Sequence, residues 1–146
     1  MIMKSIYHRL LIEAPAQKVY DAITTQQGLA GWWTPATTAK PEVDSINRFE
    51  FEDGYYKEMK VEELHPASRV EWICIQGFED WIGTTITFEL QPHKKGTVLL
   101  FHHDGFKEYD EGYASCSYDW ATFLRSLRAL VVTGKGHPFP NHHDLL

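Results

Sequence analysis

Two different hydrophobic periods divide this chain and predict two kinds of element. From Ser5 to Glu13 the character of the side chains alternates at every second position, which is typical of a β-strand with two distinguishable faces. After Gly105 the period changes to 3.6, which predicts an amphipathic helix of about 23 residues, or about 35 Å, ending near Gly134. Such a helix is long enough to cross a whole sheet. Its apolar stripe contains Tyr113, Cys116, Trp120, Phe123, Leu124, Leu127 and Val131.

Two short helices are expected directly after the first strand. Pro15 suits the first position of a helix because its missing N–H costs nothing there, and Val19, Tyr20 and Ile23 recur at helical spacing. Residues 25–31 predict a second helical turn that ends at a glycine. The two tryptophans that follow enter an irregular stretch that contains prolines.

The middle of the chain predicts an antiparallel meander. The dipeptide Asp53-Gly54 suits the primed turns that join antiparallel strands, so the residues on either side of it are expected to pair as a hairpin. Together with the first strand, the meander makes a curved sheet of about six to seven strands. The strands predicted in the meander are residues 46–52, 55–64, 69–75, 81–90 and 97–104.

Size and charge narrow the classes of function. We expect all 146 residues, 1–146, to form one domain in which residues 137–146 are a loose tail. The net charge is −6 and no run of Lys or Arg occurs, which argues against a nucleic-acid partner. No apolar stretch resembles a membrane span or a signal peptide, and the two cysteines lack the spacing of zinc or redox motifs. The expectation is a soluble, cytoplasmic protein without membrane insertion.

Few residues belong to a recognisable catalytic motif. The sequence contains no nucleophile elbow of a hydrolase, no zinc-protease motif and no phosphate-binding loop. His103 shares a strand face with Leu99 and Phe101, and two interpretations stay open. It could anchor a ligand or carry a proton, or it could be a buried histidine hydrogen-bonded to a helix residue. Cys74 and Cys116 are expected to act as small hydrophobic side chains, because apolar surroundings raise the pKa of a thiol.

The tail combines histidines with an acid. His137, His142, His143 and Asp144 could hold a transition metal. A mobile tail lacks the supporting contacts that metal sites need, so we predict no metal site and no cofactor.

Several local motifs occur in an order that resembles one superfamily. The series is similar to the SRPBCC, or START-like, superfamily, and within it to bacterial domains of the heat-shock ATPase activator (AHSA) type. The resemblance implies an α+β helix-grip fold: a curved antiparallel sheet wrapped around a long C-terminal helix, with a hydrophobic cavity between them. The motifs are Ala14-Pro15 with residues 19–23, Gly31-Trp32-Trp33, residues 61–66, Gly96-Thr97 with His103 and Gly105-Phe106, and Trp120, Leu124 and Leu127 before residues 134–138.

The resemblance implies no single chemistry, because members of this superfamily bind lipids, sterols or polyketides, cyclise substrates or act with chaperones. We expect binding of a small hydrophobic ligand without chemical change, since abundant aromatic residues occur without catalytic motifs. One alternative is a cyclase- or hydrolase-type enzyme that uses a cavity histidine, tyrosine or carboxylate, such as Glu58 or Glu71. A chaperone-associated interaction domain is the other, and a homodimer is compatible with all three. The residues expected to line the cavity are Trp32, Trp33, Phe49, Phe51, Met59, Trp72, Phe88, Phe101, His103, Tyr113, Cys116 and Trp120.

Overall fold

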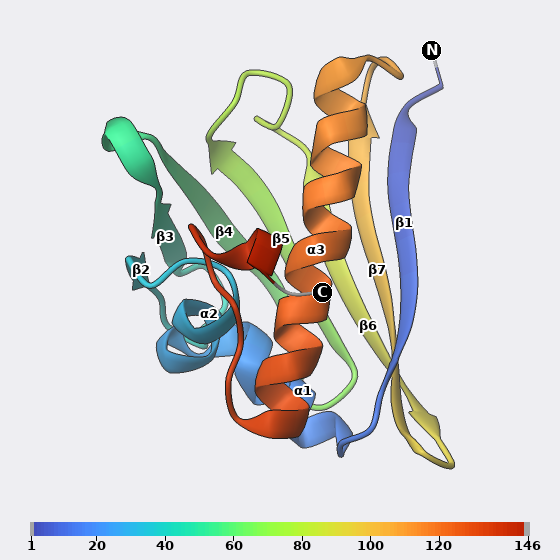
Figure 1. Ribbon diagram of the computed structural model, residues 1–146. Helices are drawn as coiled ribbons and strands as arrows, with labels where there is room; N and C mark the ends of the chain where they lie inside the picture. The colour runs from blue at the N-terminus through green and yellow to red at the C-terminus, as the bar shows by residue number, and fades with distance from the viewer. Residues whose placement is uncertain (1, 145–146) are drawn as a thin grey trace.

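Seven antiparallel strands form one curved sheet, and a long helix lies across it (Figure 1). The computed structural model describes residues 2–144. The strand order is β1-β7-β6-β5-β4-β3-β2, so the first strand pairs with the last. This confirms the α+β helix-grip fold with its two short helices after the first strand. The elements are β1 (Lys4–Ile12), α1 (Ala16–Thr24), α2 (Gln26–Trp32), β2 (Thr37–Thr38), β3 (Ile46–Glu50), η1 (Glu52–Gly54), β4 (Tyr56–His65), β5 (Arg69–Gln76), β6 (Thr85–His93), β7 (Gly96–Phe106), α3 (Glu111–Thr133) and η2 (His142–Asp144).

The predicted hairpin is present, with β3 paired antiparallel to β4. Asp53 and Gly54 both have positive φ, 59° and 74°, as a primed turn requires. Tyr55 N–H closes the turn by donating to the carbonyl of Glu52 at 3.1 Å. The two strands are shorter at the turn than predicted because residues 51–55 belong to the turn itself.

Two segments differ from the sequence prediction. Strand β6 begins at Thr85 rather than at Trp81, because the residues between β5 and β6 form successive turns. In these turns Trp81 N–H donates to the carbonyl of Phe78, and Thr84 N–H donates to the carbonyl of Trp81, each at 2.9 Å. The sequence does not predict β2, since its two residues are too few to show a period.

Helix α3 is capped at both ends. Asp110 Oδ1 accepts a hydrogen bond from Tyr113 N–H at 2.9 Å, and Gly134 ends the helix in the left-handed conformation with φ 88°. The helix has 23 residues, as its period predicts. Within residues 2–144 no helix is long and apolar enough to span a membrane.

Residues 137–144 pack against the body of the molecule rather than forming the loose tail expected. His137 N–H donates to the Ser126 hydroxyl at 2.7 Å, and Phe139 N–H donates to the carbonyl of Trp33 at 2.8 Å. Figure 1 shows this segment running back beside α3. The partners lie far away in sequence, so no local pattern reveals the contacts. The last two residues of the predicted tail fall outside the described residues.

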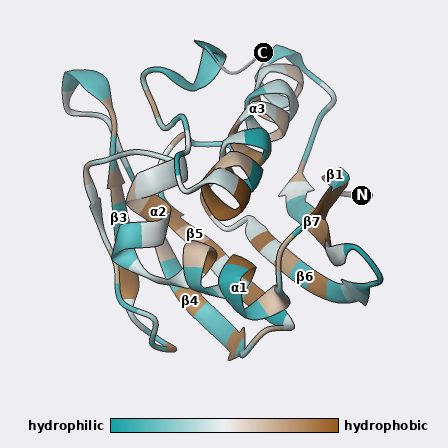
Figure 2. Cartoon of the chain, turned by 60° about the horizontal axis from the view of Figure 1, so that its bottom comes forward, coloured by the Kyte–Doolittle hydropathy of each residue, from teal (hydrophilic) through white to brown (hydrophobic). Residues whose placement is uncertain are grey.

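Aromatic side chains fill one part of the space between the sheet and α3. The ring of Trp33 is central, with its centroid 4.3 Å from that of Phe49, 5.1 Å from Trp120 and 6.1 Å from Trp72. The ring of Phe88 lies 5.0 Å from that of Trp72. In Figure 2, hydrophobic and hydrophilic segments alternate along the strands and along α3. Open space remains beside the first half of α3.

Candidate functional site

A cavity of about 1160 Å³ lies between the first half of α3 and the loops at one end of the sheet. The β3–β4 turn, the β5–β6 loop, the segment after β7 and the C-terminal tail supply its other walls. This volume slightly exceeds the range of roughly 300–1,000 Å³ that is usual for small-molecule sites. Its aromatic lining consists of Trp33, Phe51, Tyr55, Phe78, Trp81, Phe106, Trp120, Phe123 and Phe139.

Lys57 places an ammonium group in the wall of this cavity. Its Nζ lies 4.5–4.9 Å from four ring centroids, a distance at which cation–π attraction acts. The residue is only 7% exposed, and among the described residues no carboxylate lies within ion-pair distance of Nζ. Burial lowers the pKa of Lys57 to about 8. The amine is therefore held by ring faces and keeps N–H donors for a ligand. The four rings are those of Phe51, Tyr55, Phe78 and Trp81.

The sequence prediction missed Lys57, although the alternation along β4 contains the signal. Lys57, Met59 and Val61 occupy every second position, and all three are buried. Lysine is seldom buried without a partner, so a lysine in phase with two apolar residues marks an exceptional position. A charged side chain on a strand is otherwise assigned to the solvent face.

His103 lies in the core, with a partner for each ring nitrogen. Trp120 Nε1–H donates to Nδ1 at 3.0 Å, so the proton is assigned to Nε2, which donates to the Thr84 hydroxyl at 2.8 Å. That hydroxyl donates in turn to the carbonyl of Trp81. Burial, with a smaller contribution from Lys57, lowers the pKa of His103 to about 3. This is the buried, helix-bonded histidine of the second interpretation, and it leaves no nitrogen free to serve a ligand.

A comparison with protein families agrees with this architecture. Residues 13–132 match the family model described as "Activator of Hsp90 ATPase homolog 1-like protein". The chain belongs to this family. The predicted resemblance to AHSA-type domains is thereby confirmed. No curated protein shows a significant match.

Solved structures of similar proteins have the same fold as this AHSA-type chain. The Aha1 dimer from Colwellia psychrerythraea is 36% identical over 92% of this chain and 100% of that chain, with a TM-score of 0.85. A protein from Mesorhizobium loti is 20% identical over 88% of this chain and 96% of that chain, with a TM-score of 0.78. DynU16, a protein in the dynemicin biosynthetic locus, is 20% identical over 90% of this chain and 48% of that chain, with a TM-score of 0.73. The last two show the fold alone.

Four of the residues predicted to line the cavity of this AHSA-type domain do so: Trp33, Phe51, Cys116 and Trp120. Tyr113 is not among the lining residues; its hydroxyl donates to the carbonyl of Ser5 on β1 at 2.7 Å. Six more of the predicted residues are packed in the core and do not line the cavity: Trp32, Phe49, Met59, Trp72, Phe88 and Phe101.

Neither cysteine has the lowered thiol pKa of a reactive cysteine. Burial raises the pKa of Cys74 to about 11 and that of Cys116 to about 12, so each remains protonated near neutral pH. Their surroundings agree with the role of small hydrophobic side chains.

The carboxylates considered for acid–base chemistry lie on the outer face of the sheet. Glu58 pairs with Arg48 at 3.8 Å, and Glu71 pairs with Arg69 at 3.0 Å. Neither lines the cavity, so the residues suggested for a cyclase or hydrolase are not brought together. The acidic residues that do line it come from α3 and the loops: Glu52, Asp53, Glu79, Asp80, Glu108, Asp110 and Asp119.

Loops and the tail contribute most of the lining that the sequence prediction missed. Phe78 and Ile82 lie in the β5–β6 loop and are 54% and 51% exposed. In the tail, the ring of Phe139 lies 5.2 Å from that of Phe51. These segments have no hydrophobic period, so no sequence pattern assigns them to the cavity.

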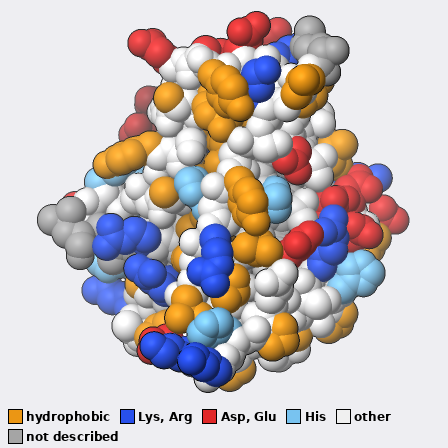
Figure 3. Space-filling model, turned by 90° about the vertical axis from the view of Figure 1, so that its right-hand side faces the viewer, with side chains coloured by type: hydrophobic (Ala, Val, Ile, Leu, Met, Phe, Trp, Pro, Cys, Tyr) orange, Lys and Arg blue, Asp and Glu red, His pale blue; other side chains and the backbone are white. Residues whose placement is uncertain are grey.

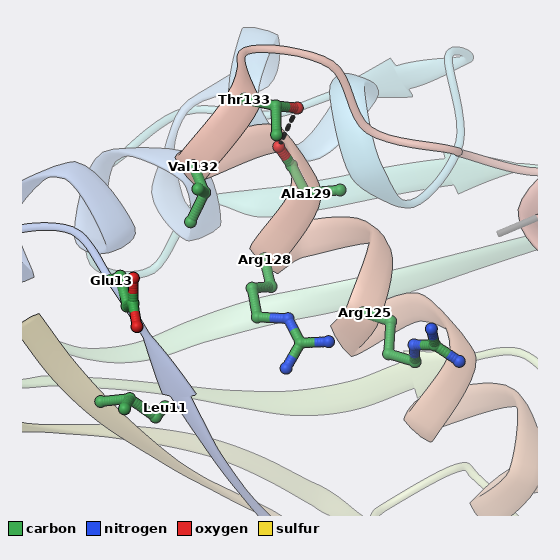
Figure 4. Close-up of a pocket in the computed structure, with 7 residues that line it drawn as sticks. All are labelled: Leu11, Glu13, Arg125, Arg128, Ala129, Val132 and Thr133. Carbon is green, nitrogen blue, oxygen red and sulfur yellow. Dashed lines mark hydrogen bonds between the residues drawn. The ribbon is translucent and has the colours of Figure 1, made fainter. Parts of the chain in front are cut away.

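A second hollow, of about 370 Å³, lies between the end of β1 and the last turns of α3 (Figure 4). Leu11 and Glu13 contribute from the side of β1, and Arg125 and Arg128 from α3. It has no aromatic lining among the described residues. On the face of the molecule that carries β1, hydrophobic side chains are scattered among charged ones (Figure 3). The aromatic cavity is therefore the stronger candidate for a ligand site.

Proposed function

We propose that this protein binds a small hydrophobic or aromatic molecule in the cavity beside α3. The observation that carries the proposal is an aromatic-lined space of about 1160 Å³. Sites with apolar walls and a few polar groups are typical of small-molecule binding. Membership of a family with a helix-grip fold supports the same function, and the two buried free thiols are compatible with a reducing compartment such as the cytoplasm.

The polar groups of the cavity narrow the chemistry of the ligand. The Lys57 ammonium can donate a hydrogen bond to a carbonyl or phenol oxygen, and the ring faces around it favour a flat ring system. Seven acidic side chains in the lining disfavour a ligand that carries several negative charges. We therefore expect a flat aromatic compound with one or two oxygen acceptors, as in aromatic polyketides.

The test compares a hydroxyanthraquinone with a sterol, a fatty acid and a phospholipid by thermal shift and native mass spectrometry. Phe78→Ala should weaken binding of the anthraquinone by about 2- to 12-fold, since one aromatic contact contributes roughly 0.5–1.5 kcal/mol. Tyr7→Ala is the matched control because Tyr7 is 58% exposed but lies on β1, outside the cavity. If no compound in the panel gives a mass adduct or raises the melting temperature, the proposal is wrong.

Similarity to Aha1 favours a second candidate function, interaction with a chaperone. The solved structure that is 36% identical is named as the Aha1 dimer. The description of the family names an activator of the Hsp90 ATPase. We propose that this chain also forms a homodimer. Light scattering should then give twice the 16.9 kDa chain mass, and the protein should raise the ATPase rate of a purified Hsp90. A monomer at every concentration contradicts the dimer, and an unchanged ATPase rate contradicts the chaperone role.

A further inference from the structure

We propose that Asp119, His142 and His143 form a binding site for a divalent transition-metal ion of the Zn²⁺ class, at the wall of the cavity. One ligand atom from each residue lies within 4.8 Å of the other two. Asp119 comes from α3 and the histidines from η2, so the site joins the tail to the helix (Figure 1). The sequence prediction of no metal site rested on a mobile tail, and this tail is packed.

The ring of His142 is fixed by its surroundings. It stacks on Phe123 with 4.3 Å between centroids and an interplanar angle of 20°, and its centroid lies 4.1 Å from that of His143. His142 is 7% exposed. This packing supplies the rigid support that a histidine in a loose tail would lack.

The His142 ring also has an atom without a partner. Its Nδ1 is the one buried side-chain nitrogen or oxygen within residues 2–144 that makes no hydrogen bond. A buried polar atom left unpaired costs about 1–3 kcal/mol, so such an atom requires an explanation. Asp119 makes no ion pair with any described residue, which leaves its carboxylate free to coordinate. A cation coordinated by this Nδ1 and by the Asp119 carboxylate would satisfy both groups at once.

The donor set selects the class of ion. Two imidazoles and one carboxylate suit Zn²⁺, Ni²⁺ or Cu²⁺, whereas Mg²⁺ and Ca²⁺ prefer oxygen ligands alone. Ligand atoms around tetrahedral zinc lie about 3.3 Å apart, so the exposed His143 and the half-buried Asp119 need only modest side-chain rotation.

Three protein ligands leave one coordination position open. Asp119 and His142 both line the aromatic cavity, so the cavity is the space from which a fourth ligand can approach. The site can therefore take water or an oxygen atom of a molecule bound there. Ion binding would also tie residues 142–143 to α3.

The experiment uses the untagged full chain, stripped with EDTA and titrated with ZnCl₂ by calorimetry, with MgCl₂ as the comparison ion. We expect one Zn²⁺ per chain, no heat with Mg²⁺, and a rise in melting temperature with Zn²⁺. Asp119→Asn and His143→Gln should each weaken binding by at least about tenfold. His65→Gln is the control, since His65 is an exposed histidine outside the cluster.

His142→Phe keeps a flat ring on Phe123 and removes both ring nitrogens. It should abolish Zn²⁺ binding, while the metal-free variant keeps its circular dichroism spectrum and melts no lower than the wild type, because the unpaired Nδ1 is gone. Absence of Zn²⁺ binding overturns the proposal, and so does unchanged affinity in Asp119→Asn, because the tail histidines alone would then hold the ion. No organic ligand enters this titration, so its failure leaves the proposed binding of a small molecule untouched.

Discussion

At the scale of single residues, the protein accommodates two buried polar side chains in opposite ways. His103 has a donor at one ring nitrogen and an acceptor at the other. Lys57 has no carboxylate partner among the described residues and relies on four ring faces. A satisfied polar group in a core costs little, whereas loss of its partner costs about 1–3 kcal/mol. Removing a partner of His103 should therefore be harmful, whereas replacing Lys57 with an apolar residue should be tolerated.

Substitution of Trp120 tests the first expectation. Trp120→Phe removes the indole N–H that donates to His103 Nδ1, so the buried nitrogen loses its donor. We expect the free energy of unfolding to fall by about 1–3 kcal/mol more than in the control Trp33→Phe. Trp33 is equally buried, at 2% exposure, and no described residue accepts a hydrogen bond from its indole. Urea denaturation of both variants measures the difference, and equal losses would show that the hydrogen bond contributes nothing.

At the scale of elements, the sequence predicts whatever depends on local period and end signals. Helix α3 has its expected length because Asp110 and Gly134 mark its ends. The start of β6 is predicted wrongly because Trp81 has high strand propensity but lies in a turn fixed by hydrogen bonds to its neighbours. The packing of the tail depends on Ser126 and Trp33, which are distant in sequence, so no period can reveal it.

A substitution at Gly136, at the beginning of the tail, tests that packing. A Cβ on Gly136 would lie 2.3 Å from the carbonyl oxygen of Gly31 and 3.1 Å from that of Ser126, so the tail would have to move away from α2 and α3. We expect Gly136→Ala to lower the free energy of unfolding by about 1–3 kcal/mol. In the control Gly112→Ala, the new Cβ would lie 3.3 Å from Asp80 Oδ2 and 3.4 Å from Asp110 Oδ1, away from any backbone atom, so we expect a smaller loss than in Gly136→Ala. Thermal melting should separate the two variants, and coincident curves would contradict close packing of the tail.

At the scale of the whole molecule, the cavity exists because α3 extends beyond the aromatic filling. Trp33, Phe49 and Trp72 fill one part of the gap, and the loops and the tail enclose the rest. Alternation along a strand shows which face a side chain occupies but not how far along the gap the filling extends. The sequence therefore predicts an aromatic interior correctly. It wrongly assigns many of the packed core residues to the wall of the cavity. Lys57 is missed for a different reason: the alternation along β4 puts it in phase with Met59 and Val61, but a charged side chain on a strand is usually assigned to the solvent face.

The pH dependence of unfolding should reveal the cost of holding Lys57 in this interior. Burial lowers the pKa of Lys57 to about 8, against 10.5 for an ordinary lysine. Between these two pH values the unfolded chain binds more protons than the folded one, so the contribution of Lys57 to the free energy of unfolding rises with pH. Below pH 8 the full penalty, about 3 kcal/mol, is present. We therefore expect Lys57→Met to stabilise the protein by up to this amount at pH 7 and to lose that advantage near pH 10.5.

The measurement is the difference in free energy of unfolding between variant and wild type at each pH. Burial raises the pKa of Tyr55 to about 12 and also raises the pKa values of both thiols. The free energy of unfolding of the wild type therefore falls at alkaline pH, and this fall masks the effect of Lys57. Subtraction removes that shared contribution. Lys60→Met is the control, since Lys60 lies on the same strand with its side chain 41% exposed. Only a group whose pKa differs between the folded and unfolded chains can make stability depend on pH. If Lys57→Met stabilises the protein equally at pH 7 and pH 10.5, burial of the ammonium carries no cost. The same conclusion follows if Lys60→Met shows the same pH dependence as Lys57→Met.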